Sequence, residues 1–151
     1  MKSNQFGSLR VMVVIILVLL TIQYELGMDV NFSPNLPELS PFGFSLARIS
    51  DALQRAGSVA LAHAGLGSFL ILLSGLTAIL AVKSGIRSVQ VFGLLGLLSI
   101  TFAAAGGVLF TLSGFQQDDY SLAMASNFIL AFIFYFLELY LLKPNPGIQG
   151  R

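Results

Sequence analysis

Hydrophobic residues fill four long stretches of the chain, and short polar segments separate them. A helix needs about 20 mostly apolar residues to cross a bilayer core roughly 30 Å thick. The pattern therefore predicts four spanning helices, at about residues 9–26, 58–82, 89–112 and 122–142. Short connections between the last three helices favour antiparallel neighbours. We expect an all-α, integral membrane up-down four-helix bundle that forms one domain over residues 1–151.

The first apolar stretch is the weakest of the four, because its unbroken run covers only Val11–Leu20. A cleaved signal peptide is the alternative, since Lys2 and Arg10 give a basic start to a short apolar core. The segment Tyr24–Met28, however, offers no small-x-small cleavage pattern. We therefore favour an uncleaved first helix.

Residues 28–57 are the one sizeable segment expected outside the membrane, and three prolines in it resist helix formation. Asn31-Phe32-Ser33 matches the acceptor pattern for N-glycosylation, but so short a match is common in ordinary loops, and we favour an ordinary loop.

The end of this segment shows helical periodicity. Leu46, Ile49 and Leu53 recur at spacings of three and four, and a second face carries Arg48, Asp51 and Arg55. The pattern predicts a short amphipathic helix on the outer membrane surface before the second span. A solvated charged face is favoured over a surface for docking a partner.

Charge predicts the orientation. The net charge is only +1, but six of the eight Lys and Arg residues lie on one side of the predicted membrane: Lys2, Arg10, Lys83, Arg87, Lys143 and Arg151. Cytoplasmic segments carry the excess of basic residues in membrane proteins. We therefore expect a multi-pass protein of the cell membrane with both termini in the cytoplasm.

Composition removes several functional classes. With 56% hydrophobic and 10% charged residues, little of the chain is left outside the bilayer. The absence of cysteine excludes disulfides, thiolate metal sites and iron–sulfur clusters. A single histidine leaves no multi-histidine metal site within one chain, and no basic run indicates nucleic acid.

Small residues recur on one face of the second and third predicted helices. Gly67 follows His63 on the first of these faces, and Gly93, Gly96 and Gly107 lie on the second. Small side chains let membrane helices approach closely. We expect these glycines to pack the second helix against the third, although a small-residue face beside a histidine can also accommodate a flat cofactor.

The polar residues inside the spans are the candidate functional residues. His63 and Asn127 have similar predicted depths, so we expect them to form a hydrogen-bonded pair in the outer leaflet. A structural histidine is the favoured interpretation. The alternative is proton handling or haem b, for which Met124 is the available second axial ligand in this chain.

Glu138 lies five residues before Lys143 in the fourth helix. A carboxylate inside a membrane is a functional candidate by default. We favour a structural role, in which Glu138 reaches the interface or pairs with Lys83, Arg87 or Lys143, over ion or proton handling. The same helix carries six aromatic residues: Phe128, Phe132, Phe134, Tyr135, Phe136 and Tyr140. Four helices cannot bury every ring, so we expect this helix to face lipid or another subunit.

Four short strings carry a family resemblance: Gln23–Asn31, His63–Gly67, Ala105–Gly107 and Ser121–Ala125. The chain resembles small four-helix membrane proteins of bacteria and archaea that have a His-x-x-x-Gly pattern and a Ser-x-x-Met-Ala entry to the last helix. The resemblance implies the fold and no established activity. The histidine placement is also similar to four-helix b-type cytochromes, but this chain lacks their other histidines.

These observations favour a non-catalytic membrane subunit that packs in a larger membrane complex, surrounded by lipid and by other subunits or copies of itself. An accessory role in a membrane enzyme is compatible with this interpretation. The alternative is a haem-binding or proton-handling or ion-handling protein centred on His63.

Overall fold

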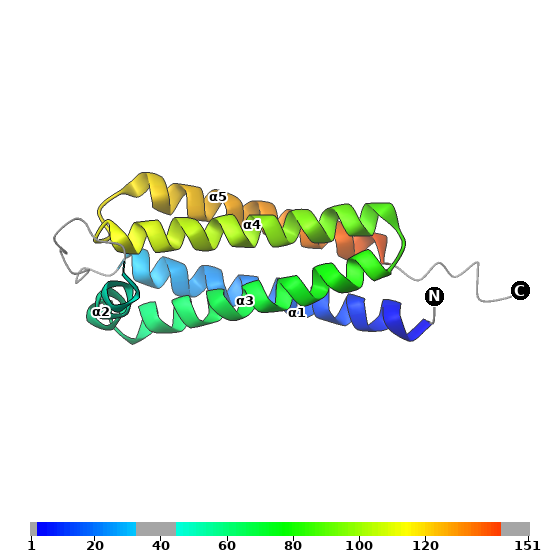
Figure 1. The fold of residues 1–151 in the computed structure, drawn as a ribbon, viewed down its shortest axis with the longest axis horizontal. Coiled ribbons are helices and arrows are strands. Elements are labelled where there is room, and N and C mark those ends of the chain that lie inside the picture. The colour runs from blue at the N-terminus through cyan, green and yellow to red at the C-terminus, as the bar shows by residue number, and fades with distance from the viewer. Residues whose placement is uncertain (1–2, 33–44, 143–151) are drawn as a thin grey trace, which may run out of the picture.

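The computed structural model of the protein describes residues 3–32 and 45–142. These residues form five helices and no strand: α1 (Ser3–Asn31), α2 (Leu46–Ala56), α3 (Ser58–Lys83), α4 (Arg87–Leu112) and α5 (Asp118–Leu141) (Figure 1). All but α2 are long and apolar enough to cross a membrane. The prediction of an all-helical chain with four candidate spans is confirmed.

Helix α1 extends further than its hydrophobicity predicts. It continues past residue 26 to Asn31, so the first four residues of the expected 28–57 loop are helical. Hydropathy marks the part of a helix that prefers lipid, whereas the helix itself can continue into polar surroundings. Asn31 is the last residue of α1, and the rest of the glycosylation pattern reaches Ser33, outside the described residues.

The four long helices lie side by side (Figure 1). Each of α1 and α4 packs against both α3 and α5, and the α4–α5 contact is the most extensive. The Ser3 end of α1, the α3–α4 connection and the Leu141 end of α5 lie at one end of the molecule. Helix α2 lies at the other end, packed against α3 and α4.

Both connections among the last three helices are tight turns. In the α3–α4 turn, Gly85 has a φ of 72°, a left-handed conformation that suits a residue without Cβ. In the α4–α5 turn, Phe115 has a φ of 62°, which is unfavourable for a bulky residue. Its N–H donates to the Phe110 carbonyl at 3.0 Å, and the two rings meet edge to face at 5.5 Å.

Helix α2 begins at a capped end. Ser45 is the N-cap, and its side chain accepts a hydrogen bond from the Arg48 N–H at 3.2 Å. Ala52 is the buried residue of this helix, whereas Leu46 is 81% exposed. Asp51 forms an ion pair with Arg55 at 2.9 Å, and both side chains are largely exposed.

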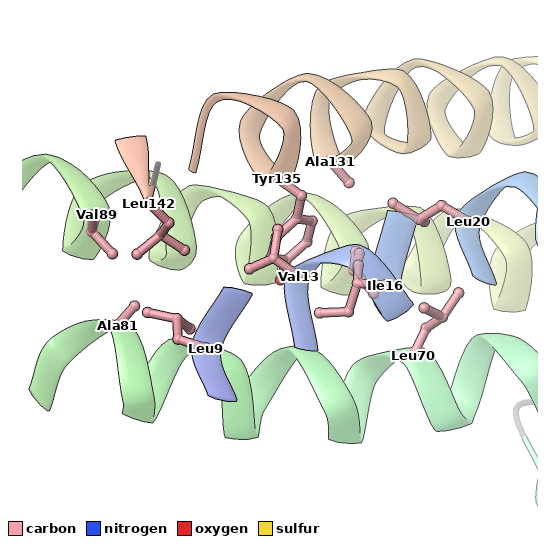
Figure 2. Packing of buried hydrophobic residues seen from close by; sticks show 11 residues of the cluster. Leu9, Val13, Ile16, Leu20, Leu70, Ala81, Val89, Ala131, Tyr135 and Leu142 are labelled. Carbon is pink, nitrogen blue, oxygen red and sulfur yellow. The ribbon is translucent and has the colours of Figure 1, made fainter. Parts of the chain in front are cut away.

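The apolar core lies in the half of the four long helices that holds the Ser3 end of α1 and the Leu141 end of α5. Figure 2 shows its side chains, with Leu9, Ala81, Val89 and Leu142 gathered toward one end. Tyr135 points from α5 into the middle of this core. The burial of Leu9, Val13, Ile16 and Leu20 makes α1 an integral part of the packing.

Candidate functional site

Buried polar atoms without a hydrogen-bond partner fall in two places within the described residues. One group contains Ser74 Oγ, the Tyr135 hydroxyl and both carboxylate oxygens of Glu138. The other contains Gln23 Oε1 and His63 Nδ1. Because buried polar groups are normally paired, unpaired ones mark places that need an explanation, such as a functional role.

The first group is enclosed between α3, α4 and α5. Ser74, Tyr135 and Glu138 each have 0% of their surface exposed. The Tyr135 hydroxyl lies near Ser74 on α3 and near Glu138 one turn further along α5, but the geometry of a hydrogen bond is not reached with either. We call these three residues the inner polar cluster.

Two glycines of α4 make room for the inner polar cluster. A Cβ on Gly93 would lie 3.2 Å from Glu138 Oε1 and 2.8 Å from the Ala81 Cβ. A Cβ on Gly96 would lie 2.6 Å from the Tyr135 ring. The glycines and the polar residues have the same spacing of three along two adjacent helices, so each glycine faces one polar side chain.

No ion pair accompanies Glu138 among the described residues. Lys83 and Arg87 at the ends of α3 and α4 are exposed, as is Arg10 of α1. Our expectation that Glu138 reaches the interface or pairs with Lys83 or Arg87 is wrong: its side chain turns inward, where Gly93 leaves space for it. Lys143, the remaining expected partner, lies outside the described residues.

The second group joins α1 to α3. Gln23 Nε2 donates to the His63 carbonyl at 3.1 Å and lies 3.3 Å from His63 Nε2. A hydrogen bond from the Gln23 amide to the ring requires His63 Nε2 to be the acceptor, with the imidazole proton on His63 Nδ1. Gly27 allows the close approach, because a Cβ there would lie 3.0 Å from the imidazole.

The expected pairing of His63 with Asn127 is replaced by this contact. Asn127 Nδ2 donates at 2.9 Å to the Ala123 carbonyl of its own helix. Helices α3 and α5 are diagonal neighbours, since each packs on α1 and α4. His63 and Asn127 therefore do not meet, although they have similar depths, because their helices are not adjacent.

His63 and Met124 do not lie where they could bind one haem as its two axial ligands. The imidazole of His63 faces Gln23 of α1, and the Met124 sulfur lies against Gly107 of α4, 3.2 Å from where a Cβ would be. The two ligands thus belong to diagonally opposed helices and turn toward different neighbours. The described residues also contain no group of three or more His, Asp or Glu side chains that could hold a metal ion.

The prediction that all four glycines pack α3 against α4 is wrong for three of them. Gly67 faces Gln23 of α1, whereas Gly96 and Gly107 face α5. Only Gly93 of the four meets the partner that we expected, through Ala81 of α3. The periodicity correctly placed these residues on inward faces, but an inward face of a four-helix arrangement touches more than one neighbour.

Two residues of these sites were not identified as candidates from the sequence. Gln23 follows the unbroken apolar run of the first helix, a position typical of the membrane boundary. Tyr135 is one of six aromatic residues in its helix, and the spacings of four, three and four that join Ala131, Tyr135, Glu138 and Leu142 distinguish it from the other five. That periodicity is the signal that could have revealed its burial.

Comparison of the chain with protein-family models, with curated proteins and with solved structures finds no match. The class that the fold itself supports is an all-helical protein with four helices suited to a membrane.

Proposed function

We propose that this chain is a small, non-catalytic, multi-pass membrane subunit that packs through α5 against the helices of other membrane subunits. The observation that carries the proposal is a row of aromatic side chains on the outside of α5. Phe132, Phe136 and Tyr140 recur at spacings of four and are 37%, 57% and 59% exposed. They form one stripe along the half of α5 that ends at Leu141.

Three other aromatic residues of α5 make contacts inside the molecule. Phe128 meets Tyr24 of α1 with ring centroids 5.9 Å apart, and Phe134 meets Phe92 of α4 at 6.3 Å. Tyr135 is fully buried in the core. Exposed phenylalanines also occur singly on α3 (Phe69) and on α4 (Phe102), whereas α5 presents a row of exposed aromatic residues.

Association of helices in lipid is driven by packing, because lipid tails are as apolar as the side chains. Aromatic rings suit such contacts, since an aromatic pair contributes about 0.5–1.5 kcal/mol beyond the area that it buries. A partner helix, from another subunit or a second copy, would supply the facing rings or small residues. The other exposed apolar surfaces face lipid in this proposal.

The same proposal includes the arrangement in the membrane. The protein is an up-down four-helix bundle of the cell membrane, with both termini in the cytoplasm and α2 as an amphipathic helix on the outer surface. The charge distribution supports it: Lys83 and Arg87 lie at the end of the molecule that also holds the start of α1, whereas Asp118 and Asp119 lie at the end that holds α2. The burial of α1 in the core supports an uncleaved first helix.

Site-specific photo-crosslinking in the native membrane tests the proposal. A photoreactive phenylalanine analogue replaces Phe136 on the stripe, and in a matched control it replaces Leu72 of α3, which is 69% exposed. We expect a discrete protein adduct from position 136 and lipid adducts from position 72. Lipid adducts alone at both positions would contradict a subunit contact at α5.

A further inference from the structure

We propose that the inner polar cluster is a proton-binding site, in which the Glu138 carboxyl group takes up and releases one proton inside the bundle. This inference is independent of the subunit proposal, because it concerns the interior of the four helices and not the outward face of α5.

Glu138 lies near the end of α5, but its carboxylate is buried in the interior and does not reach the surface. It lies three residues before the end of α5, about 5 Å along the axis, so an outward rotamer would bring it near water. Instead its side chain is fully buried and both of its oxygens lack a partner. An isolated ionised carboxylate in apolar surroundings is strongly unfavourable, and binding of a proton removes the charge.

No basic side chain of the described residues pairs with the Glu138 carboxylate at this end of the molecule. Of the four helices, α1 offers Arg10, α3 offers Lys83 and α4 offers Arg87, and all three side chains are exposed. The remaining titratable group near Glu138 is the Tyr135 phenol on its own helix. Among the described residues no basic group therefore substitutes for the proton.

The neighbours of Glu138 suit a proton better than a metal cation. The inner polar cluster supplies four side-chain oxygens, and the backbone carbonyls around it are engaged within helices. Hard divalent cations take six or more oxygen ligands. A protonated carboxyl group needs one acceptor, and the Tyr135 hydroxyl can serve as that acceptor while it donates toward Ser74.

The chemistry is a simple equilibrium. The carboxylate gains one proton from the medium and becomes a hydrogen-bond donor, and the reverse step returns the proton without any other bond changing. The hydroxyl groups of Tyr135 on α5 and Ser74 on α3 are the polar side-chain groups that accompany the carboxyl group. Gly93 and Gly96 let α4 close over Glu138 and Tyr135, which excludes water from the site.

Infrared difference spectroscopy of the full chain in lipid vesicles tests the site. The chain has three glutamates, at positions 25, 38 and 138, so the double variant E25Q/E38Q labelled with ¹³C-glutamate reports Glu138 alone. We expect the C=O stretching band of a protonated carboxyl group at neutral pH. The band should shift after transfer to D₂O, which shows that the proton exchanges, and Y135F should change its frequency.

The variant E138Q is the matched control, since it keeps the shape but cannot take up the proton, and the band should be lost. An ionised carboxylate at neutral pH would overturn the proposal. A protonated band that does not respond to D₂O would overturn it too, because the group would then be a fixed structural acid. Loss of the band when sodium replaces choline in the medium would assign the site to a cation instead.

Discussion

At the scale of single residues, the sequence identified the polar positions better than their partners. Glu138 is visible as a lone carboxylate in an apolar helix, and His63 as the one histidine. Which side chain each would meet depends on how four helices surround each other. Gln23 became the neighbour of His63 because α1 packs on α3, and a one-dimensional pattern contains no such pairing.

The His63–Gln23 contact predicts a coupling that can be measured. In a double-mutant cycle with Gln23→Leu and His63→Leu, we expect an interaction free energy of about 0.6–2 kcal/mol, the range for hydrogen bonds between membrane helices. Reversible unfolding in mixed detergent micelles provides the free energies. The matched cycle of His63→Leu with Asn127→Leu should give nearly additive effects. A coupling to Asn127 that exceeds the one to Gln23 would restore the pairing first expected from depth.

At the scale of helices, apolar length predicted four spans and located their middles well. It did not predict that α1 would run on to Asn31, because helix formation does not end where hydrophobicity does. Periodicity located the inward faces of α3 and α4. It assigned the glycines to the α3–α4 contact, whereas Gly96 and Gly107 serve the more extensive α4–α5 contact.

The α4–α5 contact predicts that Gly96 is sensitive to any side chain. A Cβ in Gly96→Ala would lie 2.6 Å from the Tyr135 ring, and the ring is enclosed, so we expect a loss of about 1–3 kcal/mol in the free energy of unfolding. In Gly75→Ala the added Cβ meets nothing within 4 Å. Its effect should be neutral or stabilising by up to about 1 kcal/mol, as for Gly to Ala in a helix. Equal stability of the two variants in detergent would show that α4 and α5 are not packed this closely.

At the scale of the whole molecule, four of the five described helices are long and apolar enough to cross a membrane. Gln23 and His63 lie in the parts of α1 and α3 that are nearer to α2, whereas Glu138 lies near the Leu141 end of α5, at the opposite end of the molecule. In the proposed orientation these are the outer and the cytoplasmic halves of the membrane.

The orientation is tested with single cysteines, which the cysteine-free chain makes unambiguous. Leu46→Cys in α2 should react with a membrane-impermeant maleimide on intact cells. Gly85→Cys in the α3–α4 turn should react only after the membrane is opened, because the positive-inside rule places that turn in the cytoplasm. The reverse order of reactivity would invert the proposed topology.

The central proposal, that the chain works as a subunit, is tested most directly by its mass in a native-like state. The chain weighs 16.2 kDa. Extraction from its own membrane into several gentle detergents, followed by native mass spectrometry, should yield a complex heavier than one chain. Exchange of Phe132 and Phe136 for leucine should weaken that complex without unfolding the protein. A stable single chain of 16.2 kDa in every detergent would contradict the proposal.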